Sequence, residues 1–285
     1  MRHHGLAYIV WDVDPQLTSL AVFGSDWPIT WYGLLFALSF LVGQRLLRYL
    51  YKQEEKPVSD VEVLTLYGVV ATVVGARLGH YLFYEWELLL ADPAHWVQSM
   101  LRVPFEGLAS HGATIALLVA LSLYSRKRPD QSFLWVLDRV VIIGSLAGAL
   151  IRLGNLFNSE IYGTPTRLPW AFVFVRETDP DLLPLVPRHP TQVYESLFCF
   201  LLFALTFSLW KQKRHHLADG FIAGLFLVLL FSFRFFVEFL KTNQEDFEHN
   251  LVLNMGQLLS IPAVLVGFIL LVKSRFRLGG VPKSG

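Results

Sequence analysis

The sequence contains few charged residues and a single cysteine. Charged side chains make up 16% of the 285 residues, whereas soluble domains carry about 25%. This composition argues against a soluble globular domain. Cys199 has no partner for an internal disulfide, and its apolar neighbours indicate a small buried side chain. Residues 1–27 lack the continuous apolar core of a secretory signal.

Several motifs that mark well-known chemistry are also absent. The chain has no HExxH motif, no cysteine cluster and no acidic group with metal-binding spacing, so we expect no metal and no other cofactor. It also lacks the GxSxG motif of serine hydrolases. The net charge is +1, and we expect no nucleic acid among the partners.

Long apolar runs dominate what is present. Hydrophobic residues make up 54% of the chain, and the mean hydropathy is +0.46. Lipid offers the backbone no hydrogen-bond partners, so apolar runs of about 20 residues predict membrane-spanning helices. We therefore predict an all-α polytopic membrane protein, with one integral membrane domain over residues 1–285. The seven predicted spans lie near residues 29–50, 61–84, 107–125, 137–157, 190–210, 219–240 and 255–273.

The basic residues predict the orientation of these spans. Most of the 24 Lys and Arg residues fall in connections on one side of the membrane, which the positive-inside rule makes cytoplasmic. With seven spans, the N-terminus is then outside and the C-terminus cytoplasmic. The residues concerned are Arg45, Arg48, Lys52, Lys56, Arg126, Lys127, Arg128, Arg139, Lys211, Lys213, Arg214, Lys273, Arg275, Arg277 and Lys283.

The segments on the other side are longer and rich in Trp, Pro and acidic residues. The prolines of residues 158–189 are too frequent for a regular helix, so we expect a small irregular cap inserted there on the outer face. Within it, residues 171–175 could form a short strand.

Arg152 is the most unusual residue of the apolar runs. It lies in the last two turns of the fourth predicted span, where a permanent charge is costly unless it meets a partner, a ligand or a water-filled cavity. Asn155 is three residues further on and shares its helix face. No acidic residue lies within one turn, and Glu160 is two turns away.

Other spans carry polar residues at a similar depth, near their outer ends. Arg presents a planar fork that matches phosphate oxygens, and His can take a proton near neutral pH. The layer therefore indicates a lipid-headgroup enzyme or a lipid-binding protein. Its members are Tyr32, Arg77, His111, Arg152, Asn155, His189, Gln192, Tyr194, Glu195, Arg234 and Glu238.

Structural alternatives remain open for several of these residues. Arg77 could bond carbonyls at a helix end, and His111 could cap a loop. Arg234 and Glu238, four residues apart, could form a neutralised bridge. Tyr32 could belong to an aromatic belt.

Seven blocks of sequence carry a family resemblance. The run Arg152-Leu-Gly-Asn-Leu-Phe-Asn-Ser-Glu-Ile-Tyr-Gly163 resembles the signature G-R-x-G-N-F-x-N-x-E-x-x-G of bacterial prolipoprotein diacylglyceryl transferases. Three departures from the family pattern are Ile151 in place of the Gly before the Arg, Ala113 in place of the second Gly after the His, and Lys241 in place of an Arg. The other blocks are residues 29–34, 75–79, 110–112, 188–195, 234–239 and 255–260.

The resemblance implies an activity and a location. Such an enzyme moves the diacylglyceryl group of phosphatidylglycerol onto the lipobox cysteine of a prolipoprotein and releases glycerol phosphate. It implies a bacterial cytoplasmic (inner) membrane protein, surrounded by membrane lipids, whose site faces the outer leaflet. His111 is then the candidate base, with Tyr32 as the alternative, and Arg152 and Arg234 hold the phosphate. Substrate-binding candidates are Tyr32, Arg77, Asn155, Asn158, Glu160, Gly163, His189, Gln192, Tyr194, Glu195 and Glu238.

Three other functions compete with this interpretation. A different lipid-modifying transferase would turn over lipid without needing a cysteine peptide. A lipid or anion transporter would place polar groups through the whole membrane depth. A purely structural scaffold would leave the charge of Arg152 unexplained.

Overall fold

The structure is a computed structural model that describes residues 8–22, 25–102, 107–176, 185–242 and 253–278. The described residues fall into two compact units. The first belongs to Met1–Gly43 and Val140–Gly285, and the second to Gln44–Arg139.

The described residues are mainly helical, as predicted, but they also include short strands, which the predicted all-α class does not cover. Among the described residues, six helical stretches are long and apolar enough to cross a membrane. They are formed by α1 (Trp31–Gln53), α2 (Ser59–Phe83), α6 (Phe133–Phe157), α7 (Thr191–Lys213), α8 (Phe221–Val237) with the 3-10 turn η2 (Glu238–Leu240), and α9 (Met255–Leu278).

The third predicted span corresponds to a shorter helix, α5 (Ser110–Arg126), which has 17 residues. At 1.5 Å per residue such a helix is about 25 Å long, against about 30 Å for the hydrocarbon core of a bilayer. The prediction of membrane-spanning helices is therefore confirmed in length and composition for six stretches. A seventh crossing stays a prediction.

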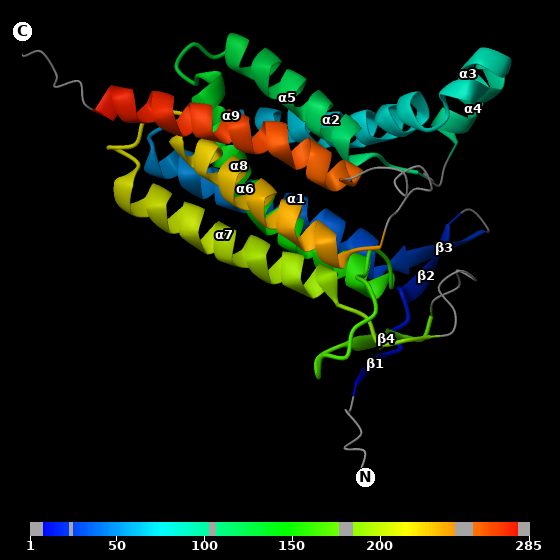
Figure 1. Cartoon of the computed structure of the whole chain (residues 1–285). Helices are drawn as coiled ribbons and strands as arrows, with labels where there is room; N and C mark the ends of the chain where they lie inside the picture. The colour runs from blue at the N-terminus through cyan, green and yellow to red at the C-terminus, as the bar shows by residue number, and fades with distance from the viewer. Residues whose placement is uncertain (1–7, 23–24, 103–106, 177–184, 243–252, 279–285) are drawn as a thin grey trace, which may run out of the picture. The chain divides into compact units, whose positions relative to one another are not determined.

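In the first unit, α6 packs against α1 and α7. Gly154 lies directly against Tyr32 of α1, and no side chain fits at Gly154. The Ser196 hydroxyl of α7 donates a 3.0 Å hydrogen bond to the carbonyl of Ala149. Helix α8 contacts both α7 and α9, which run beside it in Figure 1. The ends of these helices carry the polar residues discussed below.

Four short strands accompany the helices of the first unit. β1 (Ile9–Trp11) pairs in parallel with β4 (Phe172–Phe174), and β2 (Gln16–Val22) pairs antiparallel with β3 (Ser25–Thr30). The strand predicted within residues 171–175 is confirmed as β4, but its partner β1 was not predicted. The Trp11 indole donates to the Leu156 carbonyl at 2.9 Å, which ties β1 to the end of α6. Residues 177–184 of the expected cap lie outside the described residues.

In the second unit, α2 packs closely on α5. Gly75 and Gly79 of α2 face Gly112 of α5, and a side chain at any of the three would meet the opposite backbone. Small residues at such positions let two helices approach in a membrane. Two short helices follow α2, namely α3 (Trp86–Ala91) and α4 (Pro93–Leu101).

Candidate active site

Helix α6 ends in a tight reversal that folds the chain back on the helix. Ser159 and Ile161 have φ angles of 54° and 58°. This left-handed conformation is unfavourable for residues other than glycine, and especially for a β-branched one. The reversal brings the Glu160 carboxylate beside two amides of the helix end. Its Oε1 accepts hydrogen bonds from Asn155 Nδ2 at 2.7 Å and Asn158 Nδ2 at 3.1 Å.

Neighbouring elements hold the reversal in place. The Gln192 side chain of α7 donates through Nε2 to the Glu160 carbonyl at 2.7 Å. The Gly163 amide donates to the His189 carbonyl at 2.8 Å. Gly163 also lies against the backbone of Leu240, so any side chain there would collide with it. These contacts explain the glycine and the glutamine in structural terms.

Arg152 obtains its acidic partner from α7. Its Nε lies 3.2 Å from Glu195 Oε2, and its NH1 donates to Asn155 Oδ1 at 3.2 Å. Because Asn155 in turn donates to Glu160, the side chains form one chain from Glu160 through Arg152 to Glu195. The Arg152 side chain is 19% exposed and that of Glu195 is 7% exposed. The charge of Arg152 is thus paired with Glu195, yet the Arg152 side chain keeps some accessible surface.

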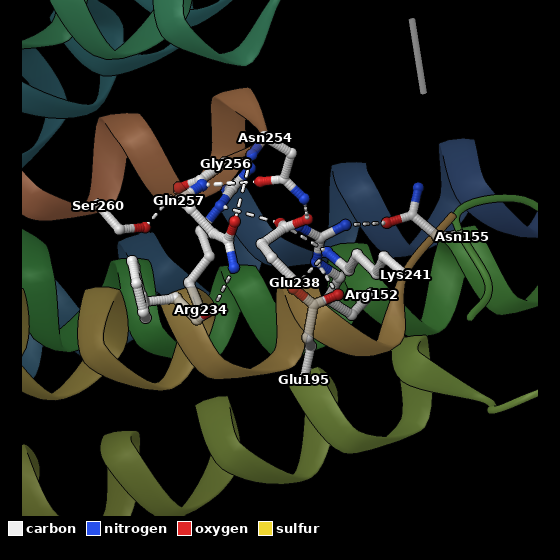
Figure 2. Close-up of polar contacts among 11 residues, drawn as sticks. Arg152, Asn155, Glu195, Arg234, Glu238, Lys241, Asn254, Gly256, Gln257 and Ser260 are labelled. Atoms are coloured by element: carbon white, nitrogen blue, oxygen red, sulfur yellow. Dashed lines mark hydrogen bonds and ion pairs between the residues drawn. The ribbon is translucent and has the colours of Figure 1, made fainter. Parts of the chain in front are cut away.

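A second cation lies on the other oxygen of Glu195. Lys241 Nζ is 3.0 Å from Glu195 Oε1 and 3.2 Å from Glu238 Oε1. Glu238 Oε1 also lies 3.5 Å from Nε of Arg234, which confirms the predicted pairing of these two residues along the helix. The result is a continuous ion network, shown in Figure 2, that runs Arg152–Glu195–Lys241–Glu238–Arg234.

The start of α9 supports the far end of this network. Asn254 and Gln257 exchange hydrogen bonds, since each side-chain oxygen accepts from the other backbone amide at 2.9 and 3.2 Å. This reciprocal capping box fixes the first turn of a helix. Asn254 Nδ2 also donates to Glu238 Oε2 at 3.3 Å, and Gly256 lies directly against the Glu238 carboxylate. The Glu238 carboxylate is therefore contacted by the start of α9 as well as by Lys241 and Arg234.

The charges of the ion network do not balance. It contains three cations and two carboxylates, so one positive charge is not compensated by a directly paired carboxylate. Glu160 is bonded to amides and reaches Arg152 only through Asn155. Arg234 is the most exposed cation, with 36% of its side chain accessible, whereas Lys241 is 2% exposed. The network is suited to hold one additional anion beside its arginines.

A separate polar group lies at the start of α7. The Trp170 indole donates to the Tyr194 hydroxyl at 2.9 Å, and that hydroxyl lies 3.3 Å from His189 Nδ1. Burial lowers the pKa of His189 below its ordinary value, because desolvation disfavours the charged ring. His189 and Tyr194 were both expected at the site, and in the structure they contact each other.

In the second unit, Arg77 bonds to backbone carbonyls. Its Nε donates to Met100 O at 2.8 Å and its NH2 to Ser99 O at 2.6 Å, and its guanidinium stacks on the Tyr81 ring at 4.7 Å. The residue is 6% exposed. These contacts match the structural alternative that the sequence left open for Arg77.

His111 occupies the first turn of α5, beside the end of α2. Its ring lies edge-on to Phe83, with 4.7 Å between ring centroids, and 5.8 Å from the Tyr84 ring. Residues Phe83 and Tyr84 thus form an aromatic wall against one side of the imidazole. The ring is partly accessible.

Three residues were missing from the predicted site: Lys241 of the ion network, and Asn254 and Gln257 beside it. Lys241 appeared in the sequence only as a departure from a family pattern, although its spacing of three from Glu238 allows an ion pair on a helix. Asn254 and Gln257 carry the N-x-x-Q spacing of a capping box, which would have predicted the start of α9. The contact of Asn254 with Glu238 has no signal in the sequence.

The helices and the site together define a class of protein. It is a multi-pass membrane protein in which an ion network of three cations and two directly paired carboxylates joins the ends of several helices. The family model of prolipoprotein diacylglyceryl transferase matches residues 20–273. The chain therefore belongs to the prolipoprotein diacylglyceryl transferase family.

Individual relatives are similar over almost the whole chain. A phosphatidylglycerol–prolipoprotein diacylglyceryl transferase of Chloroherpeton thalassium is 46% identical over 271 residues, which cover 94% of this chain and 95% of the relative. Enzymes of the same name from Porphyromonas gingivalis and Tolumonas auensis are 45% and 41% identical. The matches cover 94% and 93% of this chain, and 95% and 97% of those relatives.

Proposed function

We propose that this protein transfers the diacylglyceryl group of phosphatidylglycerol to the cysteine thiol of a prolipoprotein lipobox. The thiol sulfur forms a bond to the carbon of the diacylglyceryl group that carries the phosphate. The bond between that carbon and the phosphate oxygen breaks. Glycerol phosphate leaves with the electron pair, and the thiol proton passes to a base. The product is a thioether-linked lipoprotein, the first intermediate of lipoprotein maturation.

The observation that carries the proposal is the ion network with its uncompensated positive charge. Phosphatidylglycerol has one phosphate charge, and a fork of Arg donors matches phosphate oxygens. Arg152 and Arg234 are the two cations with accessible side chains, at 19% and 36% exposed. They bind the phosphate and then stabilise the charge that develops on the departing glycerol phosphate.

The proton of the thiol requires an acceptor. A cysteine thiol has an ordinary pKa near 8.5, so a base or a positive field is needed to form the thiolate at neutral pH. We assign this role to His111, with Tyr32 as the alternative. The lipobox peptide supplies the nucleophile, so the buried Cys199 takes no part.

The remaining predicted residues act around the arginines. Asn155, Asn158 and Glu160 orient Arg152 through the hydrogen bonds of the reversal. Glu195 and Glu238 hold the two arginines in position. Gly163, His189, Gln192 and Tyr194 hold the surrounding backbone and aromatic groups in place. Arg77, in the second unit, supports the backbone of that unit through its bonds to Ser99 and Met100.

The membrane arrangement is part of the proposal. We infer seven spans, with the N-terminus outside, the C-terminus cytoplasmic and an outer cap within residues 158–189. The protein is then a single membrane domain of the bacterial inner membrane, and the site faces the outer leaflet. That leaflet is where the signal peptide of an exported prolipoprotein is accessible.

A reconstituted assay tests the function. Purified protein is mixed with phosphatidylglycerol and a lipobox peptide, and mass spectrometry follows the peptide while glycerol phosphate is quantified. We expect a gain of one diacylglyceryl group per peptide and an equal amount of glycerol phosphate. A peptide with Ser in place of the lipobox Cys serves as the control and should stay unmodified.

Other results would identify a competing function. Release of glycerol phosphate without a cysteine peptide would point to a different lipid-modifying transferase. Movement of lipid or anion across liposomes without a chemical product would point to a transporter. Either result, together with an unmodified cysteine peptide, contradicts the proposal.

A further inference from the structure

Lys241 is a buried cation held at a fixed place in the backbone. It follows η2, and its backbone pairs with Gly163 in an isolated β-bridge. The neighbouring Leu240 carbonyl accepts a 2.7 Å hydrogen bond from the Thr164 amide. The side chain of Lys241 is 2% exposed, so its ammonium contacts protein groups and little else.

The ammonium of Lys241 lies between two carboxylates. It is 3.0 Å from Glu195 and 3.2 Å from Glu238, which come from α7 and η2. Because both carboxylates contact the same nitrogen, they lie close enough to repel each other. The positive charge of the lysine offsets that repulsion.

Each of these carboxylates also holds one arginine. Glu195 contacts Arg152 at 3.2 Å, and Glu238 contacts Arg234 at 3.5 Å. Lys241 is thus the only member of the network in the described residues that contacts both Arg-bearing carboxylates. A movement or a charge change at Lys241 would therefore affect both arginines through the two carboxylates, although none of these ion pairs joins Lys241 directly to an arginine.

The charge count gives Lys241 a second role. With the lysine, the network has three positive and two negative groups; without it, two arginines face two carboxylates. The excess positive charge that suits the network to an anion therefore depends on this residue.

We propose that Lys241 is a positioning residue that couples Arg152 and Arg234 into one phosphate clamp and supplies the net charge of that clamp. The inference rests on the proposed function and names a residue that acts through others rather than on the substrate. It also accounts for a lysine at this position, where the family resemblance leads one to expect an arginine. A point charge suffices between two separate carboxylates, where no bidentate contact with a single one is needed.

The first test compares two substitutions at this position. Lys241→Met keeps much of the volume and removes the charge, and we expect the kcat/KM for phosphatidylglycerol to fall roughly 10- to 100-fold, the usual range for losing a charged hydrogen bond. Part of that loss should appear as a raised KM, because the clamp loses its excess charge. Lys241→Arg should retain activity within a few-fold. Lys211→Met, at an exposed position of α7, is the matched control and should not change either constant.

The second test asks whether charge rather than packing is responsible. In a Glu195→Gln background the network has one carboxylate fewer, so removal of the lysine leaves the two arginines with one negative partner. We expect Lys241→Met to lower activity only a few-fold in this background. A loss as large as in the wild-type background would mean that the lysine acts by packing alone, and would overturn the proposal.

The outcomes separate this inference from the proposed function. A wild-type protein that modifies no cysteine peptide would refute the function. An active wild type with an equally active Lys241→Met variant would refute only the role of Lys241. If Lys241→Met does not fold, the double variant Lys241→Met/Glu195→Gln decides, since we expect it to fold and its activity to lie within a few-fold of that of Glu195→Gln. An inactive double variant contradicts the inference.

Discussion

Arg152 and Glu195 form a 3.2 Å ion pair between two helices, α6 and α7, that are separated in sequence by the whole reversal and the outer segment. The pair resolves the main anomaly of the sequence, a permanent charge near the end of an apolar run. It does not neutralise the site, because Glu195 shares its other oxygen with Lys241.

Replacement of Arg152 should remove most of the activity. We expect Arg152→Ala to lower kcat about 10²- to 10³-fold, the range found when a donor to a developing negative charge is lost. Arg152→Lys should recover only part of it, since an ammonium lacks the fork geometry for phosphate. Initial rates of glycerol phosphate release measure both variants. Arg126→Ala, at an exposed position, is the control, and unchanged turnover by Arg152→Ala would remove this residue from the mechanism.

Replacement of His111 tests the proposed base. We expect His111→Gln to lower turnover by about 10²–10⁴, the usual contribution of a general base. Glutamine keeps hydrogen-bonding capacity and cannot take the proton, so a folded variant should still bind phosphatidylglycerol. The exposed His216→Gln provides the comparison. If His111→Gln turns over like wild type, Tyr32 becomes the candidate to replace next.

Gly256 should not tolerate a methyl group. A Cβ at this position would come within 2.6 Å of the Glu238 carboxylate, so Gly256→Ala must displace that group or the start of α9. We expect a loss of about 1–3 kcal/mol in the free energy of unfolding, as for other overpacked sites, together with reduced activity. Gly144→Ala is the matched control because no atom lies within 4 Å of its added Cβ. Thermal unfolding in detergent should then show a lower Tm for Gly256→Ala and an unchanged Tm for Gly144→Ala.

The seventh crossing can be tested by adding one cysteine at a time on either side of α5. Arg102→Cys and Arg126→Cys place exposed thiols before and after this helix. If α5 spans the membrane, a membrane-impermeant maleimide added to intact cells should label Arg102→Cys and leave Arg126→Cys unlabelled until the membrane is opened. The unaltered chain, with its buried Cys199, gives the background. Labelling of both positions from one side would mean that α5 does not cross.

The apolar runs predicted the long helices well, because burial in lipid depends on local composition and length. The Arg234–Glu238 pair was also predictable, since a spacing of four places two side chains on one helix face. β1 was not predicted as the partner of β4, because Ile9–Trp11 and Phe172–Phe174 meet only after the chain has folded. The same holds for Trp11, whose indole bonds to the end of α6.

Some features of the site were likewise predictable from the sequence, and others depended on the tertiary structure. By itself the sequence determined that Arg152 and Asn155 share a helix face, that a buried charge needs a partner, and that the chain resembles a lipid-modifying family. Only the tertiary structure decided which partner Arg152 has, because Glu195 comes from another helix and no short-range spacing connects them. It also decided the place of Glu160, since the left-handed residues Ser159 and Ile161 turn the chain back without a glycine to signal it. Lys241 gained its role for the same reason: a charge acquires its function from the groups that folding brings around it.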